Sequence, residues 1–99
     1  MNAADDIVEP VRIAATHPAL PGHFPGNPIV PGVVLLDRIA AAIERARGLR
    51  IARIASVKFL APLKPEEDAE LRVSTDGARA RFRIDRNAVP ILRGEGELA

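Results

Sequence analysis

The chain has 99 residues, of which 47% are apolar and 27% charged, and its net charge is +1. This length suits one domain with a single modest core, and the composition is that of a globular chain rather than a disordered one. We therefore expect one domain over residues 1–99. The absence of cysteine excludes disulfides, thiol nucleophiles and cysteine-bound metals. With little net charge and only 3% aromatic residues, nucleic-acid binding is not expected.

Signals for targeting or membrane insertion are not expected either. The first six residues are acidic and lack an apolar segment, unlike a signal peptide. The longest apolar run, Ile29–Leu36, is too short to span a bilayer and contains Pro31 and Gly32. These absences favour a cytoplasmic protein with no membrane contact.

The elements predicted first along the chain are a weak strand and a helix. Residues 7–15 alternate only loosely, whereas residues 21–32 form a block rich in proline and glycine. A helix is predicted from Val33 onward, with Pro31 suited to its start and Gly48 to its C-cap. Its apolar residues recur at i, i+3, i+4 and i+7, which defines one face: Leu36, Ile39, Ala40 and Ile43.

Strand patterns occupy the rest of the chain. The segments are Ile51–Leu60, then Glu70–Thr75 after a turn bracketed by Pro62 and Pro65, then Ala78–Asp85 and Ala88–Leu98. Asp76-Gly77 is a strong two-residue hairpin signal, a second turn is expected near Asn87, and Pro90 suggests an edge strand or a late start. In the third segment Ala80, Phe82 and Ile84 are predicted to face inward, and Arg79, Arg81 and Arg83 to form a solvated face.

This order of elements predicts an α+β fold in which an antiparallel sheet wraps one central helix. The helix must bury its apolar face on the sheet. A sheet this short has edges to protect, which favours the pairing of two copies. We therefore expect a dimer.

The proline-rich block is predicted to be a rigid frame around His23. Proline fixes its own φ and restricts the residue before it, so a flexible linker would use other residues. Phe24, Ile29 and Val30 lie among the prolines, so the block should pack against the core. The alternative, a buried loop whose histidine only satisfies a backbone group, stays open on composition alone.

Two further residues favour chemistry at this block. Gly32 places free N–H groups and the positive end of a helix dipole where an oxyanion could bind. Asp37 is expected to flank the apolar stripe one and a half turns later. An imidazole, a carboxylate and such N–H groups within fifteen residues would form a coherent acid–base site.

The run His23–Val33, with an acid fourteen positions after the histidine, resembles the signature of the β-hydroxyacyl-(acyl carrier protein) dehydratases. These are hot-dog-fold enzymes of fatty acid and polyketide synthesis. The run Val57–Pro65 is similar to the family's strand and turn after the helix. Within the family, the short length and the run Ile29–Asp37 look most similar to the small dehydratases of aryl polyene clusters.

The resemblance implies that a 3-hydroxyacyl thioester loses water to give the trans-2-enoyl thioester, without a cofactor or metal. His23 would be the base at C2, Asp37 of the other subunit would orient or protonate the departing hydroxyl, and the Gly32 N–H would bind the thioester carbonyl. The substrate would be carried on the phosphopantetheine of acyl carrier protein, by a homodimer, an assembly of dimers or a heterodimer. The implied substrate tunnel comprises Phe24, Ile29, Pro31 and Val33. A docking patch for the acidic carrier would be formed by Arg38, Arg45, Arg47, Arg50 and Arg53, for which the alternative is helix-dipole complementarity and solubility.

The sequence also departs from the family pattern. Ala41 stands where the family commonly has glutamine, and Glu66-Glu67-Asp68 replaces a Gly-Asp after the second proline turn. These departures leave open a non-catalytic partner subunit, and a hot-dog thioesterase is the other alternative. His17 is expected to be a loop residue, and a metal site formed by His17, His23 and Asp37 is not expected, because their spacing is unlike that of ligands.

Overall fold

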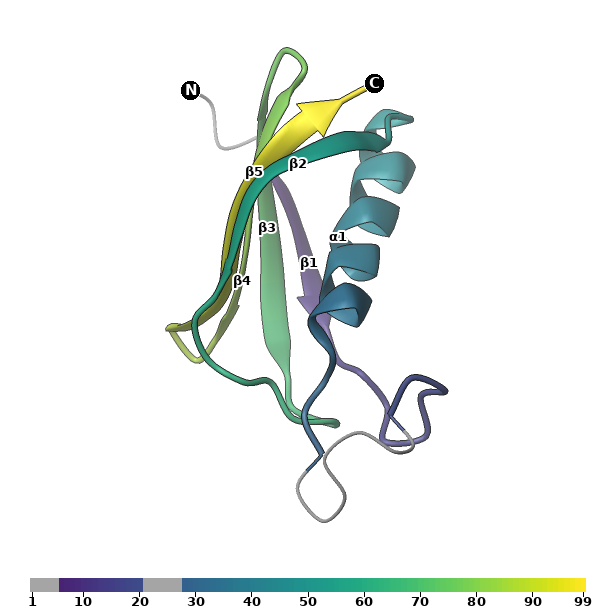
Figure 1. Ribbon diagram of the computed structural model, residues 1–99, viewed down its shortest axis with the longest axis vertical. Coiled ribbons are helices and arrows are strands. Elements are labelled where there is room, and N and C mark those ends of the chain that lie inside the picture. Colours follow the sequence, from purple (N-terminus) through teal and green to yellow (C-terminus); the bar gives the residue numbers. More distant parts are fainter. Residues whose placement is uncertain (1–5, 21–27) are drawn as a thin grey trace.

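The computed structural model describes residues 6–20 and 28–99, which form one helix and five strands. All strand pairs are antiparallel and form a single sheet in the order β1-β3-β4-β5-β2. The helix lies along one face of this curved sheet (Figure 1). The predicted α+β architecture is therefore confirmed. The elements are β1 (Ile7–Val11), α1 (Gly32–Arg47), β2 (Ile51–Phe59), β3 (Ala69–Asp76), β4 (Arg79–Arg86) and β5 (Val89–Leu98).

The helix has the predicted ends. Pro31 is its N-cap, and Gly48 adopts the left-handed conformation at φ 67°, which glycine reaches without a Cβ clash. The Gly48 N–H donates to the Glu44 carbonyl oxygen at 2.9 Å and closes the last turn. Arg45 and Arg47 lie in this turn, near the negative end of the helix dipole.

The buried face of α1 is rotated from the predicted one. Ile39 and Ile43 are fully buried as expected, but Leu36 and Ala40 are only half-buried. The other buried positions are Val34, Leu35 and Ala42. The apolar residues are too numerous for the spacing alone to locate the centre of the buried face, and packing against the sheet decides it.

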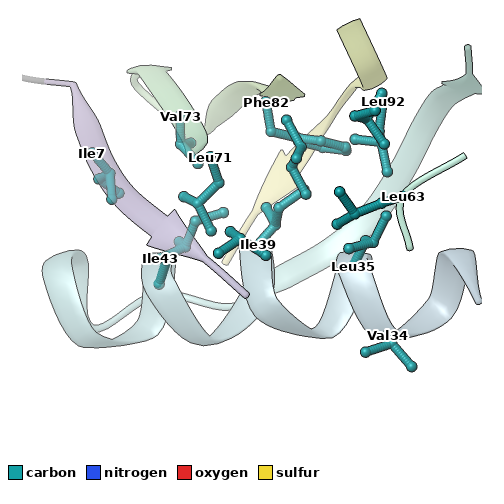
Figure 2. Packing of buried hydrophobic residues seen from close by; sticks show 14 of the residues in the cluster. Ile7, Val34, Leu35, Ile39, Ile43, Leu63, Leu71, Val73, Phe82 and Leu92 are labelled. Atoms are coloured by element: carbon teal, nitrogen blue, oxygen red, sulfur yellow. The ribbon is translucent and has the colours of Figure 1, made fainter. Parts of the chain in front are cut away.

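The core lies between this helix face and the inner face of the sheet (Figure 2). Leu35, Ile39 and Ile43 point from α1 toward the strands, while Val34 points away from the sheet (Figure 2). The strands contribute Ile7, Val11, Leu71, Val73, Ala80, Phe82, Ile84, Ile91, Leu92 and Leu98. In β4 the predicted alternation of buried and exposed residues is confirmed.

One hairpin turn differs slightly from prediction, and the other, near Asn87, lies where it was expected. Asp76 pairs with Arg79, so the β3–β4 turn is Gly77-Ala78, one residue later than expected. The β4–β5 turn is at Asn87-Ala88, where both residues have positive φ. Pro90 lies near the start of β5, before the point where β2 pairs with that strand, so it has no β2 neighbour. Neither suggestion from Pro90 is seen, because β5 starts before it at Val89, Pro90 already pairs with Asp85 of β4, and β5 is an inner strand.

Strand β2 is one edge of the sheet and is poorly covered. None of its nine residues is buried. Ile54 is 40% exposed, Phe59 53%, and Leu60 just beyond the strand 48%. Large apolar side chains on an open edge indicate a surface that an assembly would cover.

Candidate functional site

His23 and Phe24 fall in residues 21–27, outside the described part of the chain. Their predicted roles therefore stay predictions. What the structure describes is how the chain enters and leaves this segment, and where Gly32 and Asp37 lie.

The chain is held on both sides of the segment. On the entry side, the Leu20 N–H donates to the His17 carbonyl oxygen, and the Ala19 N–H donates to His17 Nδ1, both at 3.0 Å. On the exit side, the Val30 N–H donates to the Leu63 carbonyl oxygen at 2.8 Å. The half-buried His17 thus serves as a turn residue, as expected, and the ends of the proline-rich block are anchored.

The entry side has a second anchor that sequence reasoning missed. The Glu66 N–H donates to the Ile13 carbonyl oxygen at 2.8 Å, and the Ala15 N–H donates to Glu66 Oε2 at 2.9 Å. Arg12 Nε donates to the same carboxylate at 3.1 Å. The Ala15 N–H, and then Arg12, lower the pKa of Glu66. The acidic run that departs from the family pattern therefore clamps the strand exit that precedes residues 21–27.

Glu67 stabilises the same loop from within. Its carboxylate accepts from the Lys64 N–H at 2.7 Å and from Arg86 Nη1 at 3.0 Å. These contacts lower the pKa of Glu67, the Lys64 N–H contributing most and Arg86 less. Arg86 also donates to the Pro62 carbonyl oxygen at 3.2 Å. The contacts of Arg86 with Pro62 and Glu67 join residues 24 and 19 positions apart and leave no local sequence signal.

Gly32 lies directly under the ring of Phe59. A Cβ on Gly32 would be 2.5 Å from both Cε1 and Cζ of that ring, so only glycine permits this approach. At the N-terminus of α1, the first hydrogen bond runs from the Val34 N–H to the Pro31 carbonyl oxygen at 3.0 Å. Among the described residues, the N–H groups of Gly32 and Val33 have no backbone partner, as usual for a first turn. The described residues therefore leave both N–H groups open to an acceptor, and their predicted role in binding an oxyanion stays a prediction.

Sequence reasoning also missed the part played by Phe59. Its only signal was its place in the second, weaker motif, the run from Val57 to Pro65. Because the ring is about half exposed, it covers Gly32 without being locked in the core.

Asp37 is exposed and lies on the outward face of α1. Two residues from Ile39 correspond to about 200° around the helix, so the carboxylate is nearly opposite the buried face. The expectation that it flanks the apolar stripe describes only the edge of that stripe: Leu36, about 100° away, is half-buried against the core, whereas the fully buried residues are centred near Ile39. Asp37 has no hydrogen bond or ion pair with any described residue. Ala41, one turn further on, is half-buried and offers no polar group.

The described tunnel residues surround Gly32 in the chain. Ile29 and Pro31 are half-buried, and Val33 is 62% exposed.

The predicted docking arginines are exposed but do not gather around Gly32. Arg45 forms an ion pair with Glu9, and Arg53 pairs with Glu97 at 3.3 Å. Four of the five lie at or beyond the C-terminal end of α1, and Gly32 is at the other end, about 22 Å away along the helix axis. Within one chain only Arg38 is near the helix N-terminus. The full set is Arg38, Arg45, Arg47, Arg50 and Arg53.

Within residues 6–20 and 28–99, no three histidine or acidic side chains cluster in a way that could hold a metal ion. In the same ranges, no helix is both long and apolar enough to cross a membrane.

Comparison with known proteins places the chain in a family. A family model described as ApeI-like, ApeI dehydratase, matches residues 1–94. The chain belongs to the ApeI-like dehydratase family. This confirms the hot-dog dehydratase resemblance of the His23–Val33 motif, the small aryl polyene type included.

Individual relatives of this ApeI-like chain agree. The 3-hydroxyacyl-[acyl-carrier-protein] dehydratase FabZ of Chlamydia trachomatis is 32% identical over 90 residues, which cover 75% of this chain and 59% of the relative. FabZ of Haemophilus influenzae (strain PittEE) is 35% identical over 72 residues, which cover 63% of this chain and 49% of the relative. The chain thus spans about half to three fifths of these relatives.

Solved structures agree in fold. The dehydratase heterocomplex ApeI:P from Xenorhabdus doucetiae superposes with a TM-score of 0.86 at 26% identity, covering all of this chain and 91% of the other. A point mutant of the fluoroacetyl-CoA-specific thioesterase FlK gives a TM-score of 0.69 at 16% identity, covering 100% of this chain and 87% of the other. The latter likeness is one of fold alone, and together they confirm the hot-dog fold.

Proposed function

We propose that this chain dehydrates a 3-hydroxyacyl thioester carried on acyl carrier protein to the trans-2-enoyl thioester. The observation that carries the proposal is the position of Asp37. It is an exposed carboxylate without a partner among the described residues, one and a half turns into a helix whose first N–H groups are available. A carboxylate without a protein partner beside an oxyanion-type helix end is free to take part in acid–base chemistry.

The proposed reaction is a redox-neutral elimination. His23 removes a proton from C2, and the Gly32 N–H stabilises the negative charge that develops on the thioester oxygen. The electron pair then forms the C2–C3 double bond as the C3–O bond breaks. The hydroxyl leaves as water, with a proton supplied by Asp37 or returned by His23, and no cofactor is required. Oxyanion-type donors are worth about 3–4 kcal/mol in comparable sites.

The site is proposed to form between two chains. Asp37 faces away from the sheet of its own chain, so a partner can approach it without opening the core. The β2 edge, with Phe59 and Ile54 exposed, supplies an uncovered apolar surface for that partner. Phe59 also covers Gly32, so the same surface borders the helix N-terminus. We infer an isologous homodimer in which His23 of one chain faces Asp37 of the other.

A second candidate is a subunit that acts only within a complex of different chains. It is favoured by the match to a structure described as a dehydratase heterocomplex, and by Ala41 in place of the family glutamine. In that case the purified chain alone would be inactive and would gain activity with a second, related chain.

The test is to incubate the purified chain with a 3-hydroxyacyl carrier protein and to follow the products by intact-protein mass spectrometry. Dehydration lowers the mass of the acyl carrier by one water, whereas a thioesterase would release free acid and leave the unloaded carrier. The matched control is His23→Ala with an unchanged circular dichroism spectrum. Formation of enoyl product that is lost in the variant supports the proposal, and equal product from the variant contradicts it.

A further inference from the structure

The outer face of the sheet, opposite α1, carries a row of four cations. Strand register places Arg72 of β3 opposite Arg83 of β4, Arg83 opposite Arg93 of β5, and Arg93 opposite Lys58 of β2. Directly opposed residues point to the same face, and Leu71, Phe82 and Leu92 beside them point into the core. We call Arg72, Arg83, Arg93 and Lys58 the cationic row.

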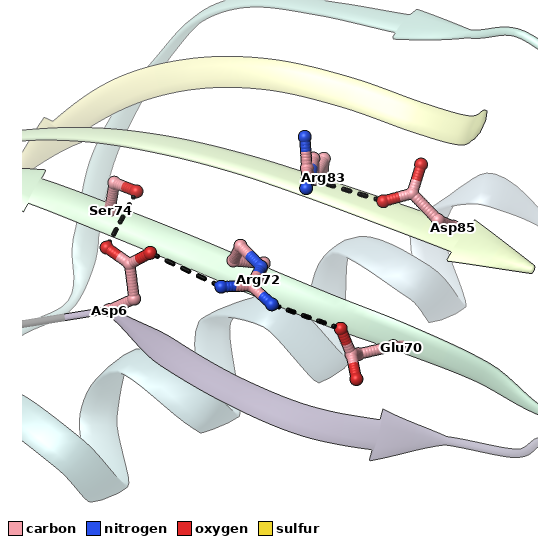
Figure 3. A network of polar contacts seen from close by, with 6 residues as sticks. All are labelled: Asp6, Glu70, Arg72, Ser74, Arg83 and Asp85. Carbon is pink, nitrogen blue, oxygen red and sulfur yellow. Dashed lines mark hydrogen bonds and ion pairs between the residues drawn. The ribbon is translucent and has the colours of Figure 1, made fainter. Parts of the chain in front are cut away.

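Such a row is unfavourable within the isolated chain. Like charges directly opposite one another on a sheet repel and lower stability. Arg72 is compensated by Asp6 and Glu70 at 3.5 and 3.4 Å, and Arg83 by Asp85 at 3.2 Å. Figure 3 shows these partners around the first half of the row.

The second half of the row lacks such compensation. Arg93 and Lys58 are exposed, and neither has an ion pair or side-chain hydrogen bond with any described residue. They lie side by side in register on β5 and β2. Two adjacent uncompensated cations are the part of the row most favourable to an external anion.

The surface along the row is hollowed. An open hollow of about 610 Å³ is lined by three members of the row, together with Arg81, Ser74, Phe82, Gly94 and Asp6, whose carboxylate pairs with Arg72. A smaller, more open one of about 200 Å³ continues it over Lys58, Arg93 and Ser56, with Glu95 at its side. Gly94 lacks a side chain, and Ser56 offers a hydroxyl beside Lys58, whereas the Ser74 hydroxyl donates to Asp6 Oδ1 at 3.0 Å. A narrow ligand can therefore lie across the strands along the row.

We propose that the cationic row is a docking surface for an acidic α-helix of another protein, separate from the site at Gly32 and Asp37. Three interstrand spacings of about 4.8 Å give the row a length of about 14 Å. Carboxylates at i, i+4 and i+8 of one helix span about 12 Å on one face, which matches this length. The proposal does not depend on the dehydratase reaction.

The surroundings of the row favour a helix over other anions. Glu70 and Asp85 flank one side, and Glu95 lies on the other, opposite Arg81. These carboxylates would repel a continuous phosphate backbone or an anionic membrane, but they suit a single acidic stripe flanked by basic side chains. A second copy of this chain is disfavoured as well, because back-to-back packing across the row would oppose its cations to one another.

The test measures binding of a labelled, lactam-stapled alanine-based peptide of about 15 residues, long enough for a stable helix. It carries glutamates at i, i+4 and i+8, and the matched peptide carries glutamines there. We expect the glutamate peptide alone to bind in fluorescence anisotropy, more weakly at higher salt. Arg93→Gln/Lys58→Gln should weaken binding about 3- to 10-fold, as two exposed ion pairs are lost.

The matched control is Arg79→Gln, which removes an exposed arginine of the same face that lies opposite Glu97 rather than in the row. This variant should bind like the wild type. Equal loss in the control, equal binding of the glutamine peptide, or no binding at all would overturn the proposal. Tighter binding of a DNA duplex or phosphatidylserine vesicles would favour a general polyanion surface instead. A change of assembly mass in the double variant would make the row a contact between copies.

Discussion

The contact between Gly32 and Phe59 allows packing and catalysis to be separated. Gly32→Ala would place its Cβ 2.5 Å from two ring atoms of Phe59, so the ring must swing away. Because the ring is 53% exposed, it can move into solvent without disturbing the core.

The cost of Gly32→Ala can be estimated from these contacts. Full burial of a phenylalanine is worth about 1.5–3 kcal/mol, so displacing a half-buried ring costs about 1 kcal/mol. Alanine regains up to about 0.5–1 kcal/mol over glycine in a helix. We therefore expect Gly32→Ala to lower the free energy of unfolding by at most about 1 kcal/mol, the Phe59 displacement being partly offset by that gain. In a Phe59→Ala background the same change should be neutral or stabilising, which gives a coupling of about 1 kcal/mol.

The assay is a double-mutant cycle by urea denaturation, run beside turnover of the 3-hydroxyacyl carrier substrate. If the thioester must approach the Gly32 N–H, Gly32→Ala should lower turnover by at least about 10-fold, toward the losses seen for oxyanion donors. In the Phe59→Ala background, Gly32→Ala should then cost no stability but should still lower turnover. Turnover that returns together with stability, measured against Phe59→Ala alone, would refute the reasoning and make Gly32 a packing residue.

Four further outcomes are expected. Ile39→Ala should destabilise the fold by about 2–5 kcal/mol in urea denaturation, because it empties a fully buried site, and a loss below about 1 kcal/mol would contradict the core assignment. Because the pKa of Glu66 is lowered in the folded state, its ionised carboxylate stabilises the fold at pH values above the ordinary pKa of 4.5. This stabilisation is lost as the pH falls through the folded-state pKa, so Glu66→Gln should flatten the decline of melting temperature between neutral and acid pH. An unchanged acid profile would remove the proposed clamp. Arg93→Gln should leave the melting temperature unchanged or raise it by about 1–3 °C, and a fall would mean that the repulsion in the cationic row is compensated. Asp37→Asn should keep the fold by circular dichroism but lower turnover, and full turnover would show that the amide suffices to orient the hydroxyl.

Local signals predicted the helix and its ends well. The caps at Pro31 and Gly48 could be predicted because each depends on the local backbone conformation that proline or glycine favours. The alternation of β4 was equally reliable, since a strand with one buried face repeats every two residues. Even the hairpin error of one residue at Gly77 left the pairing of β3 with β4 intact.

Contacts between distant segments could not be predicted in this way. The position of β2 beside β5, the ring of Phe59 on Gly32 and the clamp from Glu66 to Ala15 each depend on how the sheet is assembled. The degree of exposure of Asp37 could not be predicted for a related reason, because the sheet buries Leu35 fully and Leu36 only in part. The motif indicated the candidate site residues and the family, but the spatial positions of those residues could be obtained only from the folded structure.

The central claim is that dehydration occurs at a site shared between two chains, and subunit complementation tests it most directly. His23→Ala and Asp37→Ala chains, each expected to be inactive alone, are refolded together, and the mixed dimers are verified by mass. In a mixed dimer one site carries both lesions and the other regains both wild-type groups. Random mixing makes about half of the dimers mixed, so activity should return to roughly a quarter of the wild-type value. If both groups came from one chain, every site would keep a lesion, and verified mixed dimers without activity would contradict the account.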